Sequence, residues 1–379
     1  MNMSYVKFFL LNYLAILWKI NYVQGIKFSH VEWEHDFYSI GDLHGDKDAF
    51  LKILVNENII DSDNNLVREN VLIVITGDVL DPGYDDIDVL FFIEEYNEKG
   101  KSMNSRILMT LGNHEVNNLC LQFKRGVDES KTNGESDIGN VGDGSALSGM
   151  INETEIERYR DRNNLFRKNE VVYNYLVKTP FVIKVNDIVF SHAGVLPFYA
   201  YYGIDFINQE GKREVENNCE VLMEKRKKQE EMCICCDYGP TLNRYYSSVN
   251  DSIFRRSMVC STLTKALLLL NSNKMVIGHT VQKNYRVNSF CDEKLLLTDT
   301  GTSKWKNGVI SYIEYFKDGE YNVKYLDRAQ KKSTPCRDCD TFSHPILGFV
   351  SELGFVNKGR FGRNNLKELN RRSSKETLL

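Results

Sequence analysis

The segment Val71–Gly83, with the sequence VLIVITGDVLDPG, decides the fold around which the rest of the chain is built. Five apolar residues, mostly β-branched, run into Gly77 and Asp78. A short apolar run that ends at turn residues is typical of a strand buried in the core of a parallel sheet. Because α/β folds place ligand-binding groups just beyond the ends of such strands, Asp78 is predicted to face a ligand.

Two neighbouring segments repeat this pattern. Residues 36–41 are predicted to form a strand that leads into Asp42, and residues 106–111 one that leads into Asn113. Asp42 and Asp78 are 36 positions apart, and Asp78 and Asn113 are 35 apart. A β-α-β unit takes roughly 30 or more residues. Three parallel strands joined by helices would therefore bring these three side chains to one edge of a sheet.

The second half of the chain holds further strands of this kind. Residues 181–185 and 188–191 are predicted to form a hairpin whose second strand leads into His192, and residues 274–278 a strand that leads into His279. The pattern also predicts helices that begin at Asp46 and at Asp85 or Asp86, a polar helix over 154–168, a helix over 259–270 and a strand over 295–301.

The first 25 residues are a separate segment, predicted to be a signal peptide. Lys7 precedes the apolar run Phe8–Trp18, which is too short for the roughly 20 residues that a membrane-spanning helix needs. A cation, a short apolar stretch and then small Gly25 are typical of a secretory signal, and an anchoring N-terminal helix is the alternative. No later segment is apolar enough to span a bilayer. We therefore expect the secretory pathway, either the endoplasmic reticulum or a secretory organelle, or secretion.

The remaining chain is predicted to hold one globular domain over 26–330 and a C-terminal extension over 331–379. A stretch rich in Gly, Ser, Asn and Asp, at about 124–153, is predicted to be a flexible insert. The extension ends in a basic tail. The net charge of −4 gives no indication of nucleic-acid binding.

The nine cysteines suit an oxidising compartment only in part, because an odd number leaves one thiol free or paired with another molecule. Cys233, Cys235 and Cys236 form one cluster, and Cys336 and Cys339 another. Disulfides or free thiols are favoured over a zinc site, since the spacing of the first cluster is irregular. The pairing stays open.

Six polar residues follow apolar strand-like runs: Asp42, His44, Asp78, Asn113, His192 and His279. Carboxylates, imidazoles and an amide suit Mn, Fe or Zn, and six ligands exceed what one zinc site with an open position uses. The set suits two divalent ions that share Asp78 as a bridging ligand. Two ions roughly 4 Å apart generate a hydroxide nucleophile and stabilise an in-line phosphoryl displacement.

His114 directly follows one of these predicted ligands, so it is expected at the same site without necessarily binding metal. It could protonate a leaving group, with Asp81 orienting its ring. A single histidine or Gly-Asp pair is usually part of a turn. However, four of the seven histidines follow predicted strands within small-residue motifs, which makes coincidence improbable: His44, His114, His192 and His279.

Five sequence blocks resemble, in order, the signature of the phosphoprotein phosphatase family of metallophosphoesterases: Gly41-Asp-Leu-His44, Gly77-Asp-Val-Leu-Asp81, Gly112-Asn-His-Glu115, Ser191-His-Ala-Gly194 and Gly278-His279. The resemblance implies an α/β fold of four layers, with two mixed β-sheets flanked by helices. It also implies one metal held by Asp42, His44 and Asp78. The second metal would be held by Asp78 with Asn113, His192 and His279, and His114 with Asp81 would form the acid pair.

Two differences from the eukaryotic serine/threonine phosphatases indicate which subgroup of the family the chain resembles. Eukaryotic serine/threonine phosphatases carry arginines where this chain has Leu111 and Pro82. Pro82 removes a bidentate phosphate ligand that a point charge replaces poorly. Residues 239–246 resemble the loop that supplies a phosphate-binding arginine, here Arg244, in the Shewanella-like protein phosphatases. With the predicted signal peptide, the chain is similar to the secreted versions in apicomplexan parasites.

The residues and the resemblance together predict a phosphomonoesterase that acts on phosphoproteins (serine/threonine, tyrosine or both). A hydroxide bridging two divalent ions would attack phosphorus, Arg244 would hold the phosphate, and His114 would protonate the leaving oxygen. Lys283 and the segment 158–167 are further candidates for phosphate binding. The alternatives are a nucleotide or diadenosine polyphosphate hydrolase, a cyclic phosphodiesterase, or a pseudo-phosphatase that binds partners. No oligomeric state is predicted.

Overall fold

The computed structural model describes residues 29–120, 162, 164–217, 219, 221–222 and 233–328. All of them belong to one compact unit, Met1–Ala329. The predicted signal peptide, the insert at about 124–153, most of the predicted helix over 154–168, and the C-terminal extension with Cys336 and Cys339 lie outside the described residues.

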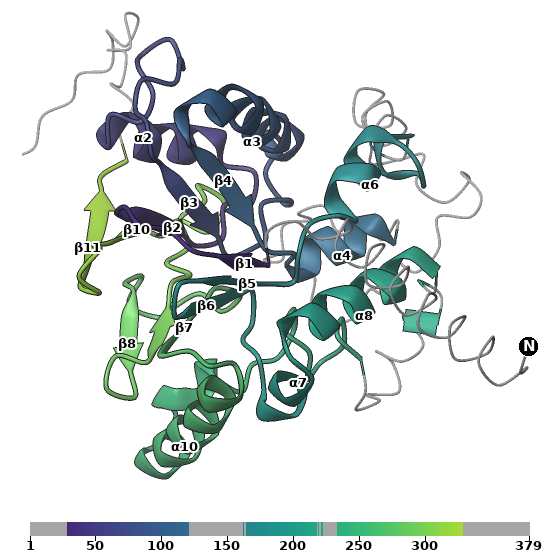
Figure 1. Ribbon diagram of the computed structural model, residues 1–379, viewed down its shortest axis with the longest axis vertical. Coiled ribbons are helices and arrows are strands. Elements are labelled where there is room, and N and C mark those ends of the chain that lie inside the picture. Colours follow the sequence, from purple (N-terminus) through teal and green to yellow (C-terminus); the bar gives the residue numbers. More distant parts are fainter. Residues whose placement is uncertain are drawn as a thin grey trace, which may run out of the picture. The chain divides into compact units, whose positions relative to one another are not determined.

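The first sheet has five strands in the order β11-β10-β2-β3-β4 (Figure 1). β2, β3 and β4 run parallel, while β10 pairs antiparallel with β2 and with β11. This confirms the three parallel strands predicted from the spacing. The strand bounds are β2 Phe37–Ile40, β3 Leu72–Ile75, β4 Arg106–Met109, β10 Ile310–Tyr315 and β11 Tyr321–Leu326.

The second sheet has six strands in the order β1-β5-β6-β7-β9-β8. β5 and β6 form the predicted hairpin, and β6, β7 and β9 run parallel. The bounds are β1 His30–Val31, β5 Val182–Val185, β6 Ile188–Ser191, β7 Lys274–Ile277, β8 Asn288–Phe290 and β9 Leu295–Leu297. Both sheets are mixed, as the resemblance implied.

Helices flank the two sheets, with α2 and α3 beside the first and α7, α8 and α10 beside the second (Figure 1). The bounds are α2 Lys47–Asn56, α3 Asp86–Gly100, η1 Lys101–Met103, α4 Asn113–Leu119, α6 Val171–Leu176, α7 Pro197–Tyr202, α8 Ile204–Asn217, η2 Ser247–Asn250 and α10 Ile253–Leu269. Asp46 caps α2 as predicted, because its side chain accepts from the N–H of Ala49.

The continuous apolar run of β3 is explained by burial on both faces. Leu72 and Val74 belong to an apolar cluster that also contains Phe190 of the second sheet, so they pack between the sheets. Ile73 and Ile75 belong to the cluster that includes the flanking helices. Burying each such side chain contributes about 1.5–3 kcal/mol. The strand therefore needs apolar residues at every position, which is why it is conspicuous in the sequence.

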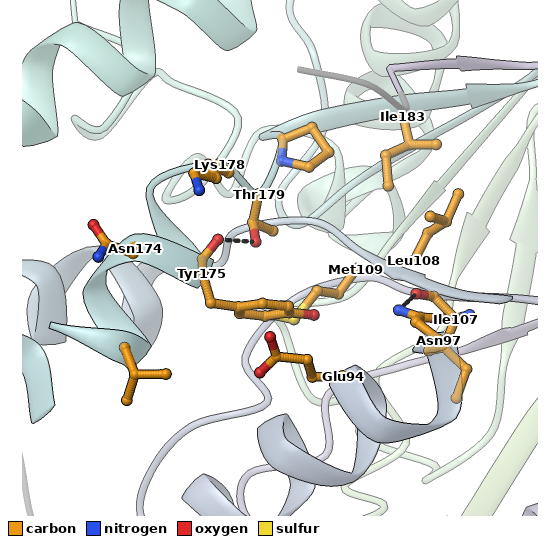
Figure 2. Close-up of a pocket in the computed structure, with 12 residues that line it drawn as sticks. Glu94, Asn97, Ile107, Leu108, Met109, Asn174, Tyr175, Lys178, Thr179 and Ile183 are labelled. Atoms are coloured by element: carbon orange, nitrogen blue, oxygen red, sulfur yellow. Dashed lines mark hydrogen bonds between the residues drawn. The ribbon is translucent and has the colours of Figure 1, made fainter. Parts of the chain in front are cut away.

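The outer edge of β4 is covered by a side chain from α3. Asn97 accepts from the N–H of Ile107 at 2.7 Å and donates Nδ2 to the Ile107 carbonyl at 2.9 Å (Figure 2). A pocket of about 430 Å³ borders this edge, lined by residues that include Glu94, Tyr175 and Lys178. No predicted site residue lines this pocket. This pocket is thus separate from the predicted site residues.

Candidate metal centre

Loops from both sheets bring the six predicted ligands to one site. Asp42 and His44 follow β2, Asp78 follows β3, and Asn113 begins α4 just after β4, all from the first sheet. His192 follows β6 and His279 follows β7 in the second sheet. All but Asn113 and His279 are nearly inaccessible to solvent.

Asp78 lies at the centre of the cluster. Its Oδ2 is 3.3 Å from His192 Nε2 and 3.8 Å from His114 Nε2. Two groups of side chains have ligand atoms close enough to hold a cation, and they share Asp78: His44, Asp78 and His114, and Asp78, His192 and His279. Asp42 Oδ2 is 4.0 Å from His44 Nε2, beside the first group. The arrangement matches the bridging position predicted for Asp78.

The histidine hydrogen bonds indicate where a cation would fit. His192 Nδ1 donates to the Thr76 carbonyl at 2.9 Å, which leaves its Nε2 without a proton in the neutral ring. His279 Nε2 donates to the Leu242 carbonyl at 3.1 Å, which leaves its Nδ1 bare. These two bare nitrogens face each other at 3.1 Å. Facing lone pairs beside the Asp78 carboxylate fit a divalent cation, and carbonyl-held imidazoles are typical metal ligands.

Buried negative charge also favours cations here. Burial, together with the neighbouring carboxylates of Asp299 and Asp78, raises the pKa of Asp42 well above its usual range. Burial, with a contribution from Asp78, raises the pKa of Asp299 to about 6, and Asp299 Oδ2 has no hydrogen-bond partner among the described residues. Asp299 was missed as a site residue. It lay within the strand predicted over 295–301, whereas in the structure β9 ends at Leu297 and Asp299 follows it.

Glu115 holds the two loops that carry Asp78 and Asn113. Its carboxylate accepts from the N–H groups of Asp78 at 2.9 Å, Leu80 at 3.0 Å and Gly112 at 2.7 Å. Burial and the charge of Asp78 raise the pKa of Glu115 to about 7. Glu115 belongs to one of the sequence motifs, but the sequence analysis gave it no role. In the structure it holds the backbone of the loops that carry Asp78 and Asn113.

Several site residues adopt a backbone conformation that side chains disfavour. φ is positive at His44, Asp78, Asp81 and His279, with values of 46°, 48°, 40° and 68°. Such conformations cost of order 1–3 kcal/mol each and are concentrated at functional sites. Gly112 is required for a different reason, which is close packing against Asp78. A Cβ at Gly112 would lie 2.2 Å from Asp78 Oδ1.

The structure also brings the predicted acid pair together. His114 Nδ1 lies 3.9 Å from Asp81 Oδ2, and the His114 side chain is 21% exposed. Burial alone would lower the pKa of His114, but the carboxylates of Asp78 and Asp81 outweigh it and raise that pKa to about 9. In the metal-free protein, His114 is therefore expected to carry a proton at neutral pH.

Arg244 lies beside the metal-site residues. Its guanidinium is exposed and donates to Thr280 Oγ1 at 2.9 Å, one residue beyond His279. Its loop is held by Asn243, whose Nδ2 donates to the Gly194 carbonyl at 2.7 Å. Arg244 can thus reach a bound anion. Lys283 is also exposed and lies four residues beyond His279.

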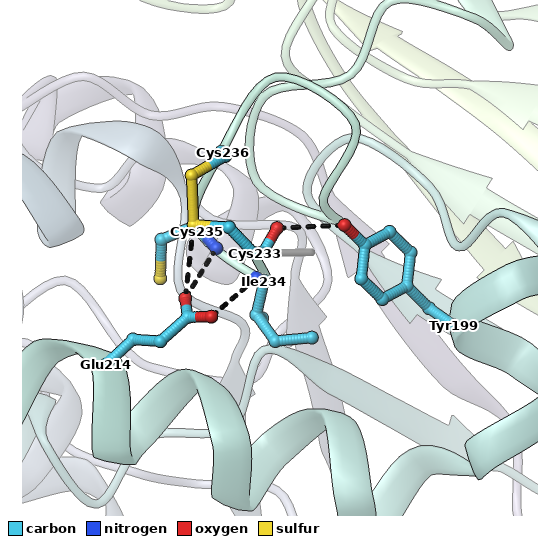
Figure 3. Close-up of a disulfide and its surroundings, with 6 residues drawn as sticks. All are labelled: Tyr199, Glu214, Cys233, Ile234, Cys235 and Cys236. Carbon is cyan, nitrogen blue, oxygen red and sulfur yellow. Dashed lines mark hydrogen bonds between the residues drawn. A yellow bond between two sulfur atoms is a disulfide. The ribbon is translucent and has the colours of Figure 1, made fainter. Parts of the chain in front are cut away.

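A three-cysteine cluster secures the start of the Arg244 loop. Cys233 and Cys236 form a disulfide, and Cys235, which lies between them in the sequence, is buried and takes no part in it (Figure 3). The Glu214 carboxylate accepts from the N–H groups of Ile234 and Cys235, both at 3.0 Å. The expectation of a disulfide or free thiols is confirmed for this cluster. Disulfides also join Cys120 to Cys219 and Cys260 to Cys291.

The segment 158–167 was a candidate for phosphate binding, and for Arg162 that prediction is wrong. Its guanidinium is buried and bound by Asp81, Asp86 and Asn118, so it is not available to a phosphate. Arg167 is exposed, whereas the other two arginines of the segment, Arg158 and Arg160, lie outside the described residues. The site residues were predicted because they directly follow strands. Arg162 could not be found in this way, because no predicted strand ends just before it.

Comparison with known proteins agrees with this geometry. The sequence profile of the calcineurin-like phosphoesterase family matches residues 36–283, which span all six predicted ligands. The chain belongs to the calcineurin-like phosphoesterase family. This phosphoesterase is 26% identical over 316 residues to Shewanella-like protein phosphatase 1 of Plasmodium berghei, covering 82% of this chain and 79% of that protein.

Two further relatives of this phosphoesterase are informative. It is 27% identical over 353 residues to Shewanella-like protein phosphatase 2 of Arabidopsis thaliana, covering 84% and 83% of the two chains. Its fold is similar to the crystal structure of a cold-active protein-tyrosine phosphatase of a psychrophilic Shewanella species. That match has a TM-score of 0.60 at 20% identity and covers 79% of this chain and 83% of the other.

Proposed function

We propose that this phosphoesterase is a metal-dependent protein phosphatase that removes phosphate from serine, threonine or tyrosine side chains of proteins. The observation that carries the proposal is the pair of possible metal-binding groups that share Asp78, together with the approach of His114 Nδ1 to Asp81 Oδ2 at 3.9 Å. The names of the two relatives, both Shewanella-like protein phosphatases, support a phosphoprotein as the substrate.

Each residue has a distinct role in this proposal. Asp42, His44, Asp78, Asn113, His192 and His279 would hold two divalent ions, which we propose to be Mn, Fe or Zn from the mixture of oxygen and nitrogen ligands. Ions bound there supply an activated water molecule and offset the charge of the phosphoryl group. Arg244 binds phosphate oxygens from the solvent side. His114 donates its Nε2 proton to the leaving oxygen, and Asp81 keeps its ring oriented.

The deciding experiment measures phosphate release from phosphotyrosine and phosphothreonine peptides by residues 26–379. The assay is run with Mn²⁺, after chelation, and with the His114→Asn variant. Release that needs metal and is lost in the variant supports the proposal, and the ratio of the two peptides gives the substrate class. Two bound metals per chain without release from either peptide would refute it. Pro82→Arg would then be the first variant to test for recovered turnover.

We further propose that the protein acts in the secretory pathway. The N-terminal segment Phe8–Trp18 supports this, and so do the three disulfides, which persist in oxidising compartments. Among the described residues, no helix has the length and apolar character to cross a bilayer. N-terminal sequencing of the protein from the cells that make it tests the proposal. A mature chain that begins near residue 26 supports it, and an intact Met1 contradicts it.

A further inference from the structure

Asp81, the proposed partner of His114, is held by a buried network of side chains. Its Oδ1 accepts from an Arg162 terminal nitrogen at 3.1 Å, and its Oδ2 accepts from Asn118 Nδ2 at 2.6 Å. The same Oδ2 faces His114 Nδ1 at 3.9 Å. Both carboxylate oxygens of Asp81 are therefore fixed, and one of them points to the ring that it is proposed to orient.

Arg162 binds three side chains of this network, namely Asp81, Asp86 and Asn118. Its guanidinium donates to Asp86 Oδ1 at 3.0 Å, lies 2.8 Å from Asp86 Oδ2, and donates to Asn118 Oδ1 through Nε at 3.0 Å and a terminal nitrogen at 2.8 Å. It also lies over the Phe166 ring at 5.1 Å. A planar guanidinium with fixed donor directions can hold three such acceptors at once, which a lysine cannot do.

The contact between Arg162 and Asn118 decides which way the Asn118 amide points. Because Oδ1 accepts two N–H groups of Arg162, the NH₂ group must face the other side. There it donates to Asp81 Oδ2 and to the backbone carbonyl of His114 at 2.8 Å. Rotating this amide would leave a carbonyl oxygen against a carboxylate. Arg162 therefore sets the position of the side chain that links Asp81 to the backbone of His114.

Arg162 also supplies the positive charge that two buried carboxylates need. Asp81 and Asp86 are both almost fully buried, and the Asp81 N–H donates to Asp86 Oδ2 at 3.1 Å, so the two carboxylates share one pocket. Buried charges need partners, and breaking one such pair typically costs 3–5 kcal/mol. Arg162 supplies that partner from a segment distant in the sequence. Pro82, which lies between the two acids, has no side-chain charge to offer.

We propose that Arg162 is a positioning residue for proton donation. It fixes the Asp81 carboxylate and the Asn118 amide so that Asp81 holds the His114 ring in the orientation from which it protonates the leaving oxygen. This proposal rests on the role of His114 in the proposed function. Arg162 itself contacts neither the substrate nor the predicted metal ligands' side chains in the contacts described above.

The test uses the dependence of the rate on the leaving group. The p-nitrophenolate group leaves with little need for a proton, whereas a threonine hydroxyl needs one. Arg162→Gln is therefore expected to lower kcat on a phosphothreonine peptide by about 10²-fold while p-nitrophenyl phosphate turnover stays close to that of the unmodified protein. The KM and the metal content should not change. Arg213→Gln is the matched control, because Arg213 is an exposed arginine on α8 that is not among the candidate site residues.

A second variant separates positioning from folding. Arg162→Gln leaves Asp86 buried without its cation, so Arg162→Gln/Asp86→Asn removes both charges and is compared with it by thermal unfolding. The selective loss on phosphothreonine should persist in the double variant even when its melting temperature recovers. Equal losses on both substrates, or a loss that disappears with recovered stability, would overturn the proposal and leave Arg162 a purely structural residue.

His114→Asn is assayed in parallel so that the two proposals fail separately. If His114→Asn shows the selective loss and the Arg162 variants do not, only the positioning role is overturned. If His114→Asn keeps full turnover on phosphothreonine, the acid assignment itself is wrong, and the role of Arg162 is overturned with it. If the unmodified protein releases no phosphate from either the phosphothreonine or the phosphotyrosine peptide, the proposed function fails first.

Discussion

Asp78 and His114 are neighbours whose protonation states are set in opposite directions. Burial would raise the pKa of Asp78, but the histidines around it, His192 first, hold that pKa well below its usual range. The same carboxylate helps to raise the pKa of His114 to about 9. One residue is therefore kept as an anion for cations and the other as a proton donor, although their Oδ2 and Nε2 atoms lie only 3.8 Å apart.

Asp78→Asn is predicted to abolish metal retention and activity together. The amide keeps the shape of the side chain but removes the negative charge shared by both metal-binding groups. Elemental analysis of the purified variant, beside a phosphatase assay, measures both. Normal metal content in the variant would contradict the central role of Asp78.

His114→Asn is predicted to keep its metal and to lose turnover by about 10²–10⁴, the usual contribution of general acid catalysis. The group formed by Asp78, His192 and His279 does not include His114 and remains to hold a cation. Steady-state rates with a phosphopeptide and a metal determination are needed together. A rate equal to that of the unmodified protein would remove His114 from the mechanism.

The metal-free protein should show the charge of His114 as a dependence of stability on pH. A histidine whose pKa is raised from 6.5 to about 9 adds stability that is complete below about pH 6.5 and is lost as the pH rises through about 9. The loss attributable to His114 is about 3 kcal/mol, since one pKa unit corresponds to about 1.4 kcal/mol. Urea unfolding of the chelated protein between pH 6 and pH 10 measures it.

The difference between the unmodified protein and His114→Asn isolates this contribution from that of other titrating groups. His192, whose pKa is also raised, is present in both proteins. The free-energy gap between the two should narrow as the pH rises. Two curves that stay parallel across this range would show that His114 does not gain its charge from Asp78 and Asp81.

The six predicted metal ligands could be chosen from the sequence because each follows an apolar run and a strand end allows few positions. Asp299 also follows an apolar run, Leu295–Leu297, but it belonged to no recognised motif. Asn118 and Arg162 could not be predicted. Asn118 lies on a helix face whose neighbours depend on tertiary packing, and Arg162 reaches the site from a segment with no local pattern. The positive φ values of His44 and Asp81 were likewise not predicted from the sequence.

At the scale of elements, the strands were predicted better than the helix ends. β3 and β7 were evident because both faces are buried, so β3 is wholly apolar and β7 is apolar except for Lys274 at its start. α10 begins at Ile253, six residues before the predicted start at Val259. Ile253 and Phe254 are 90% and 75% exposed, so the first turns lack the apolar face on which the prediction relied. The Ser252 side chain, which accepts from the N–H of Arg255, caps this start.

The edge of β4 gives a prediction at this scale. Asn97→Leu would remove both hydrogen bonds that the side chain makes to Ile107, and each buried polar group left bare costs about 1–3 kcal/mol. We expect a lower free energy of unfolding with a normal metal content, since Asn97 does not touch the candidate metal centre. Urea unfolding measures the loss.

Asn322→Leu is the control for that variant. Asn322 is an exposed asparagine on β11, the other edge strand of the same sheet. The same change of residue there should alter stability little. If the two variants unfold at the same urea concentration, the Asn97 side chain does not protect the edge of β4.

At the scale of the whole molecule, the three disulfides of the described residues close loops of very different lengths. Cys120 and Cys219 are 99 positions apart, and they join the end of α4, which carries His114, to the region that follows α8. Cys233 and Cys236 are only 3 positions apart and secure the Arg244 loop. The first bond therefore limits the unfolded chain far more than the second, although both lie near the elements that carry the site.

Removing these bonds should destabilise the protein in the order of the loops they close. In the chain-entropy account, a loop of about 100 residues is worth about 4.7 kcal/mol, and one of a few residues under about 2 kcal/mol. Cys120→Ala/Cys219→Ala should therefore lower the free energy of unfolding much more than Cys233→Ala/Cys236→Ala, as measured by urea unfolding without reductant. The second pair should instead affect phosphate binding, because its loop leads to Arg244. Equal destabilisation by the two pairs would mean that contacts in the folded protein, rather than restriction of the unfolded chain, determine what each disulfide contributes.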